Sequence, residues 1–187
     1  MACRVVIEGG LPKAIGLGKT ELRAAAGAFA ERSASRIGVP FREVTVILQD
    51  DAFSAEVHEA INGAAGATDV ITQRYDAMPG DKPGVYGELY VNVDQALRAA
   101  PKRRGWSPAK ELLLYVAHGM DHLSGADDLS PADYDRMRRR ELGWLSGLNT
   151  EAQRHGEILN MSFGNGAFNL QLGGGTSCTN HCASVSL

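Results

Sequence analysis

Residues 107–128 read SPAKELLLYVAHGMDHLSGADD, and this stretch predicts both a central helix and the chemistry that it carries. Ser107 is a favoured N-cap residue, and Pro108 suits the first helical position, where a backbone N–H would have no helical partner. Nonpolar or small residues then recur at helical spacing, at Leu112, Val116, Gly119 and Leu123. Such a stripe indicates an amphipathic helix over 107–123 whose stripe faces the hydrophobic core.

Two histidines of the same stretch lie away from that stripe. His118 and His122 are four residues apart, so they stand one turn from each other on one helical face. Their ring nitrogens can therefore approach a single ion at about 2.0–2.1 Å. Gly125 predicts the end of the helix in a positive-φ turn, which brings Asp128 back toward the same ion. Three ligands with a fourth position open form the arrangement of a catalytic metal site.

The rest of the chain predicts a mixture of strands and helices. Alternating, β-branched segments such as EVTVIL at 43–48 are typical of strands. The predicted strands are 4–8, 43–48, 69–75 and 85–93, and the further helices are 20–36, 53–61 and 130–148. Strands that come mostly early and helices that come mostly late favour an α+β fold, a small mixed sheet with helices packed on one face.

The chain divides by composition into one domain and a tail. Residues 1–150 are long enough for a single domain with a hydrophobic core, whereas 151–187 predicts a flexible tail of low complexity. No Lys, Arg, Asp or Glu occurs from 158 to 187. The tail contains Cys178, His181 and Cys182, which can bind a metal ion opportunistically, but a solvated tail is the simpler interpretation.

Bulk properties restrict the classes of function. A net charge of -3 gives no general affinity for nucleic acid, so an RNA-binding surface has to be a local patch. The three cysteines lie near the two ends, form no disulfide framework and favour a reducing compartment. No apolar run approaches the about 20 residues of a membrane span, and the N-terminus lacks a secretory signal. We therefore expect a soluble, cytoplasmic protein without a membrane partner.

The run from His118 to Asp128, HGMDHLSGADD, resembles the signature H-G-x-L-H-L-x-G-Y-D-H of the YbeY-type endoribonucleases, the bacterial rRNA maturation factors. Similar segments flank it: LQDD at 48–51, TDVI at 68–71, GEL at 87–89, Glu111 seven residues before the first histidine, and a closing helix at 137–148. The resemblance covers roughly residues 20–148. It implies a zincin-like α+β fold, one zinc ion, and single-strand-specific RNA cleavage in 16S rRNA 3′-end processing and ribosome quality control. The implied partners are single-stranded rRNA and the small ribosomal subunit, not DNA.

The chain departs from the family signature at three positions. Asp128 stands where the family has a histidine ligand, and its hard oxygen makes manganese an acceptable alternative to zinc. Asn62 replaces an arginine expected to bind phosphate, and Asp121 replaces a leucine beside the second histidine. Arg74 is a candidate substitute for the missing arginine. Another is the run Arg136, Arg138, Arg139 and Arg140, although a solvated helix face explains that run more simply.

The remaining candidates concern catalysis. Glu111 shares the helical face of the two histidines, so it is a candidate to orient a ligand or relay a proton. The alternative is a plain structural or surface role. A metallopeptidase carries the glutamate of H-E-x-x-H directly after its first histidine, where this chain has Gly119. We therefore expect a metal-dependent endoribonuclease of rRNA maturation, with Glu111, Asn62 and Arg74 as candidate catalytic residues. The alternatives are a non-catalytic ribosome-associated factor that keeps the fold and the metal and, more distantly, a metallopeptidase.

Overall fold

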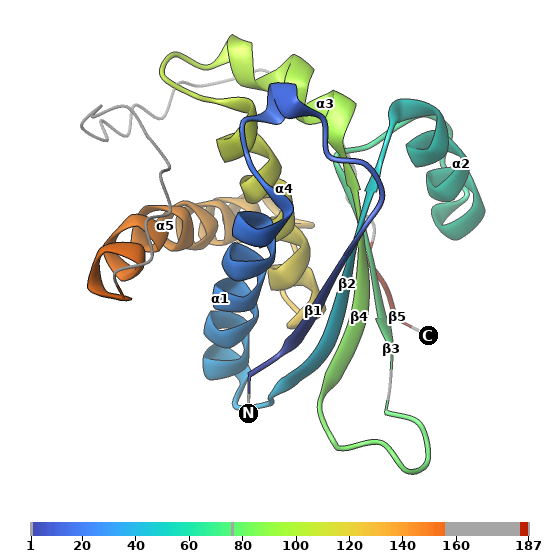
Figure 1. Ribbon diagram of the computed structural model, residues 1–187. Helices are drawn as coiled ribbons and strands as arrows, with labels where there is room; N and C mark the ends of the chain where they lie inside the picture. The colour runs from blue at the N-terminus through green and yellow to red at the C-terminus, as the bar shows by residue number, and fades with distance from the viewer. Residues whose placement is uncertain (1, 76, 156–183, 187) are drawn as a thin grey trace.

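The computed structural model describes residues 2–75, 77–155 and 184–186 and shows a mixed β-sheet with helices packed against it (Figure 1). The strands are β1 (Arg4–Glu8), β2 (Phe41–Gln49), β3 (Val70–Tyr75), β4 (Val85–Asn92) and β5 (Ser184–Ser186), in the spatial order β1-β2-β4-β3-β5. Strand β2 runs parallel to both β1 and β4, whereas β3 is antiparallel to β4 and parallel to β5.

The larger helices lie on one side of this sheet. The helices are α1 (Lys19–Ile37), α2 (Asp51–Asn62), α3 (Val93–Ala99), α4 (Pro108–Leu123) and α5 (Pro131–His155), with 3₁₀ turns η1 (Lys13–Ile15) and η2 (Ala100–Lys102). Figure 1 shows α1, α4 and α5 on one side of the sheet and α2 on the other, near the end of β2. The predicted class, α+β with a small mixed sheet, is confirmed.

Helix α4 is the central helix of the fold. All of its residues from Glu111 to Leu123 are buried. Its predicted inward stripe packs on the sheet so closely that a Cβ atom on Gly119 would lie 2.7 Å from Cδ2 of Leu89 on β4. Because ordinary carbon–carbon contacts lie near 3.5–4.0 Å, glycine at this position lets the helix approach the sheet. The opposing face of β2 contributes Val44, Val46 and Leu48 to the same core.

The larger differences from the predicted boundaries lie at the C-terminal end. Helix α5 continues to His155, beyond the predicted end at 148, and β5 lies inside the predicted tail. The Cys178 to Cys182 motif lies outside the described residues, and the division into a domain and a flexible tail stays a prediction. Among the described residues, no helix has both the length and the hydrophobicity of a membrane span.

Candidate metal centre

The predicted ligands His118, His122 and Asp128 come together around the C-terminal end of α4. The Nε2 atoms of the two histidines are 3.2 Å apart. Carboxylate oxygens of Asp128 lie 3.7 Å from Nε2 of His118 and 3.9 Å from Nε2 of His122. Ligand atoms about 2 Å from a shared tetrahedral ion are separated by about 3.3 Å. This ligand triangle, as we call the three residues, therefore has nearly the size that one ion requires.

Hydrogen bonds at the opposite ring nitrogens determine which nitrogen faces the ligand triangle. His118 Nδ1 donates to Oε1 of Glu141 at 2.6 Å, and His122 Nδ1 donates to the carbonyl oxygen of Ala126 at 3.0 Å. Because ionised carboxylates and carbonyls only accept, the proton of each neutral ring is assigned to Nδ1, and the Nε2 lone pairs face each other. Two lone pairs this close, beside a carboxylate, repel until a cation lies between them. The residues present therefore fit a divalent metal ion.

Burial favours the neutral form of the His122 ring. Burial lowers the pKa of His122, and the neighbouring His118 lowers it further, while the charge of Asp128 acts in the opposite direction. Neutral imidazole is the form that binds a metal ion. His122 can therefore bind a metal ion without first losing a proton from its ring.

Glu141 is a site residue that the sequence analysis missed. Its side chain on α5 is fully buried, and its second carboxylate oxygen lies 3.3 Å from Arg138. Burial alone raises the pKa of Glu141, but the hydrogen bond from His118 and the positive charges nearby outweigh it, so the pKa lies below its ordinary value. The carboxylate is thus ionised where it orients His118. A signal was available, because Glu141 interrupts a nonpolar stripe of Met137, Leu145 and Leu148.

Replacing Glu141 with alanine is expected to weaken metal affinity about 10- to 100-fold, because His118 loses the partner that fixes its ring and its tautomer. Competition against a chromogenic zinc chelator measures this change. Asp135→Ala is the matched control, since it removes an acid from the exposed side of the same helix. Equal zinc affinity in the Glu141→Ala variant and the wild type would show that the hydrogen bond does not support the site.

The loop after α4 turns as predicted. Gly125 has a φ of 80° and its N–H donates to the carbonyl of His122 at 2.8 Å. The side chain of Asp127 is used within the loop, where it accepts from the backbone N–H of Asp128 at 2.8 Å. Asp128, not Asp127, therefore faces the histidines.

The extra acid Asp121 is neutralised inside the fold. It is fully buried, and Nε of Arg140 on α5 donates to its carboxylate at 2.8 Å. Arg36 on α1 lies 3.4 Å from the other carboxylate oxygen. The arginine run by itself favours a solvated helix face. Arg138 and Arg140 are instead paired with buried acids.

Two of the three candidate catalytic residues, Glu111 and Arg74, make polar contacts with other parts of the protein. The Glu111 carboxylate is buried and lies 3.1 Å from Arg103. Arg74 on β3 donates to the carbonyl of Leu123 at 3.0 Å. Asn62 ends α2, and its buried amide has no hydrogen-bond partner among the described residues. A catalytic role for each of the three stays a prediction.

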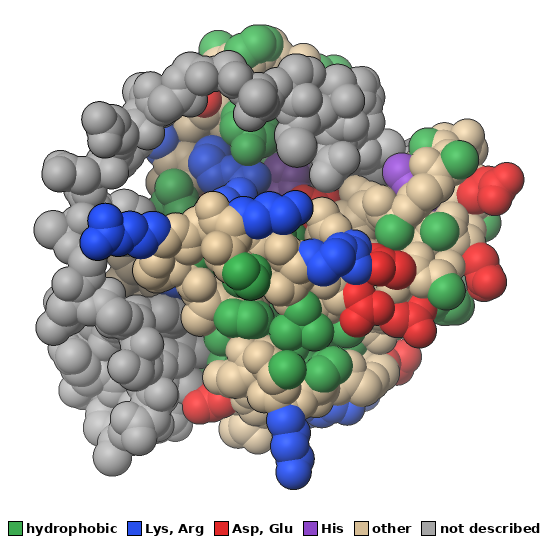
Figure 2. Space-filling model, turned by 90° about the horizontal axis from the view of Figure 1, so that it is seen from above, with side chains coloured by type: hydrophobic (Ala, Val, Ile, Leu, Met, Phe, Trp, Pro, Cys, Tyr) green, Lys and Arg blue, Asp and Glu red, His purple; other side chains and the backbone are tan. Residues whose placement is uncertain are grey.

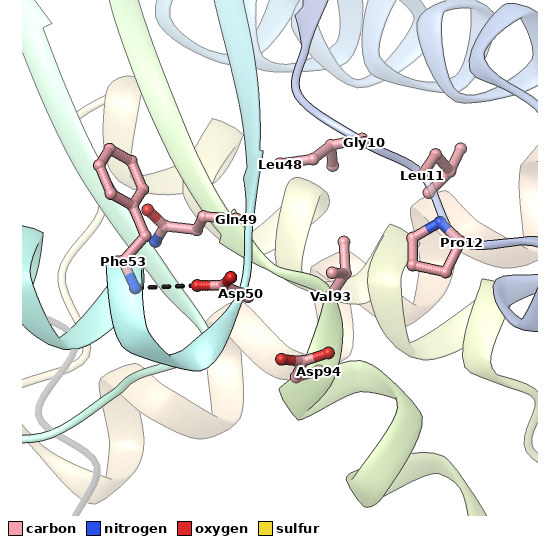
Figure 3. Close-up of a pocket in the computed structure, with 9 residues that line it drawn as sticks. All are labelled: Gly10, Leu11, Pro12, Leu48, Gln49, Asp50, Phe53, Val93 and Asp94. Atoms are coloured by element: carbon pink, nitrogen blue, oxygen red, sulfur yellow. Dashed lines mark hydrogen bonds between the residues drawn. The ribbon is translucent and has the colours of Figure 1, made fainter.

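A separate hollow of about 590 Å³ lies at the carboxyl end of β2 (Figure 3). Its walls come from the loop after β1, the end of β2 and the starts of α2 and α3, and include Gln49, Phe53 and Asp94. At its edge the Asp50 carboxylate accepts from the backbone N–H of Phe53 at 2.9 Å, as expected of an N-cap residue. No residue of the ligand triangle lines this hollow, so it is not the metal centre.

The fold and the ligand triangle together define the class: a small α+β protein with a candidate metal site at the end of a buried central helix. The model of one family, described as endoribonuclease YbeY, matches residues 15–149, which is more than half of the chain. This chain belongs to the endoribonuclease YbeY family.

Individual relatives agree with this assignment. The chain is 34% identical over 116 residues to the endoribonuclease YbeY of Anaeromyxobacter sp., covering 61% of this chain and 59% of that protein. It is 40% identical over 85 residues to the endoribonuclease YbeY of Rhodopirellula baltica, covering 45% and 42%. The match thus spans less than two thirds of these two relatives. The fold is similar to the solution structure of a Thermotoga maritima protein, with a TM-score of 0.53 and 25% identity, covering 82% of this chain and 94% of that one.

Proposed function

We propose that this chain is a metal-dependent endoribonuclease that cleaves single-stranded RNA in rRNA maturation, including 3′-end processing of 16S rRNA, and in ribosome quality control. Its partners are then rRNA and the small ribosomal subunit in the cytoplasm. The observation that supports this most directly is the triangle of His118, His122 and Asp128 in a chain of the YbeY family. We propose zinc as the resident ion, with manganese tolerated because of the aspartate oxygen.

The chain's own residues hold the ligands for this reaction. Glu141 and the carbonyl of Ala126 fix the two imidazole rings so that both Nε2 atoms face the same point. Asp128 is the most exposed of the three ligands, at 13% of its side-chain surface, so RNA approaches from its side. An ion bound there supplies a Lewis acid for a phosphoryl oxygen and makes a water molecule more acidic.

Packing at Gly119 argues against a metallopeptidase. The glutamate of H-E-x-x-H would stand at this position, but a side chain here points at Leu89 and Val70 of the sheet, with Cβ distances of 2.7 and 3.2 Å. A general base therefore cannot be placed next to the first histidine. Peptide hydrolysis needs such a base to protonate the leaving amine, whereas RNA cleavage releases an alcohol.

A non-catalytic ribosome-associated factor is the second candidate, and Asn62 favours it. An asparagine cannot supply the charge that an arginine offers to a phosphate. Such a factor would keep the fold and the metal while binding RNA or the small subunit without cleaving it.

Cleavage assays separate these functions. The zinc-loaded chain is expected to cut single-stranded RNA slowly, to spare the same sequence in a duplex, and to lose the activity in the His122→Ala variant. Asn62→Arg is expected to raise the rate, because a guanidinium can bind a phosphate through two hydrogen bonds. A fully metal-loaded chain that cuts no RNA in either form would favour the ribosome-associated factor. Cleavage of casein without cleavage of RNA would favour the peptidase.

A further inference from the structure

Most arginines around the candidate metal centre are already paired inside the protein. The pairs are Arg36 and Arg140 with Asp121, Arg138 with Glu141, Arg136 with Asp133, and Arg74 with the carbonyl of Leu123. Asp121 and Glu141 are fully buried, so moving an arginine from them to a phosphate would leave a buried carboxylate short of its partner. A strand of RNA brings about one negative charge per nucleotide, and these arginines are poorly placed to neutralise it.

The end of η2 and the loop that leads to α4 carry a run of exposed basic side chains. Lys102, Arg103 and Arg104 are consecutive, and all three are exposed. In the part of the chain that the structure describes, neither Lys102 nor Arg104 is paired with a carboxylate. Figure 2 looks down on the end of the molecule where this loop lies in Figure 1, and it shows several Lys and Arg side chains on that face. We call Lys102, Arg103 and Arg104 the basic loop.

Contacts with α4 fix the basic loop in place. Arg103 pairs with Glu111 at 3.1 Å, and its guanidinium lies 5.6 Å from the ring centre of Trp106. The amine of Lys110, in the first turn of α4, lies 4.6 Å from the centre of the same ring. The loop is therefore attached to α4 by an ion pair and a cation–π contact.

Helix geometry places this attachment on the side of the metal centre. Glu111 is seven residues before His118, which is close to two full turns, so both share one face about 10 Å apart along the axis. Tyr115 lies between them. Burial raises the pKa of Tyr115, the charge of Glu111 raises it further, and Arg103 lowers it, so these charges lie close to that phenol. Arg103, Glu111, Tyr115 and His118 thus follow one another along a single side of α4.

We propose that the basic loop binds the phosphodiester backbone of a single-stranded polynucleotide a few nucleotides from the metal centre. Lys102 and Arg104 make the phosphate contacts, and Arg103 is a positioning residue that holds the loop against Glu111. This inference rests on the proposed function for the identity of the ligand. It also assigns Glu111 a positioning role, because its carboxylate contacts Arg103.

Binding of a labelled 2′-O-methyl oligonucleotide to the zinc-loaded full chain tests the proposal, because this ligand keeps the phosphates and resists cleavage. The Lys102→Gln/Arg104→Gln variant is expected to bind about tenfold more weakly at low salt, since two phosphate contacts are lost. The slope of log affinity against log salt should decrease by about 1.4, which is about 0.7 for each contact on a single strand. With RNA as substrate, the KM should rise while kcat stays close to the wild-type value.

Arg42→Gln/Lys82→Gln is the matched control, since it removes the same charge. Arg42 donates to the carbonyl of Pro83, and both residues lie at the end of the sheet opposite the basic loop (Figure 1). Unchanged affinity in the basic-loop variant, or an equal loss in both variants, would overturn the proposal. Selective loss of binding in a chain that cuts no RNA would support the basic loop and contradict the hydrolysis. Absence of binding by the wild type would overturn both the basic-loop proposal and the proposed action on RNA.

Discussion

Replacing Asp128 with alanine is expected to empty the metal site and to lower RNA cleavage at least about a hundredfold, since a site with two ligands loses much of its binding free energy. In the wild type, Asp128 completes the ligand triangle, with its oxygens 3.7 and 3.9 Å from the two Nε2 atoms. Without it, the two imidazoles form an incomplete site. Elemental analysis of the purified variant measures zinc per chain, and a single-stranded RNA assay measures the rate.

Asp127→Ala is the matched control for this prediction, because it removes the neighbouring carboxylate. That carboxylate accepts a hydrogen bond from the backbone N–H of Asp128, so its loss should loosen the loop slightly and leave about one zinc per chain. Loss of zinc in Asp127→Ala with retention in Asp128→Ala would mean that the loop presents the other carboxylate to the ion.

Gly119→Val is expected to have the largest effect on stability. A valine there would push its Cβ to 2.7 Å from Leu89 and 3.2 Å from Val70, in a core where both neighbours are fully buried. Overpacking of this kind costs about 3 kcal/mol. For a chain of this size the melting temperature should then fall by about 6–12 °C, which calorimetry or circular dichroism can measure.

The same substitution at Gly143 separates overpacking from the effect of a β-branched residue in a helix. Gly143 lies on the exposed side of α5, and a Cβ there meets no atom within 4 Å. Gly143→Val should therefore melt at or slightly above the wild-type temperature, because glycine is the poorer helix former. If both variants had the melting temperature of the wild type, α4 would be free to move away from the sheet, contrary to the packing described above.

The features that could be predicted from the sequence are those that depend on near neighbours. Ser107 caps α4 by accepting from the N–H of Lys110, and Gly125 takes the positive φ that its position required. The ligand triangle belongs to the same group, since its three members lie within eleven residues of the chain. Spacing along a helix and the conformational preference of one glycine are enough to bring these groups together.

The features that were missed depend on residues far apart in the chain. Glu141 is 23 residues from His118, so no local spacing connects the two side chains. Asp121 looked like an uncompensated charge because Arg36, which helps neutralise it, is on α1. The sequence indicated correctly that Glu111 shares the histidine face, but its partner Arg103 comes from a loop without helical periodicity. Only the packing of the elements reveals such pairs.

The two histidines are anchored differently, and this links the loading of the ion to the stability of one helix. The anchor of His122 is a carbonyl four residues further along, whereas the anchor of His118 is Glu141 on α5. An ion that binds more tightly when Glu141 orients the His118 ring also binds more tightly when α5 is packed against α4. By reciprocity, the bound ion stabilises the packed position of α5. At an ion concentration a hundred times the dissociation constant, ion binding as a whole adds about 2.7 kcal/mol to the stability of the folded state. Although the ion is held only by residues of α4 and the loop after it, its binding then favours the packing of α5 against α4 through the Glu141–His118 hydrogen bond.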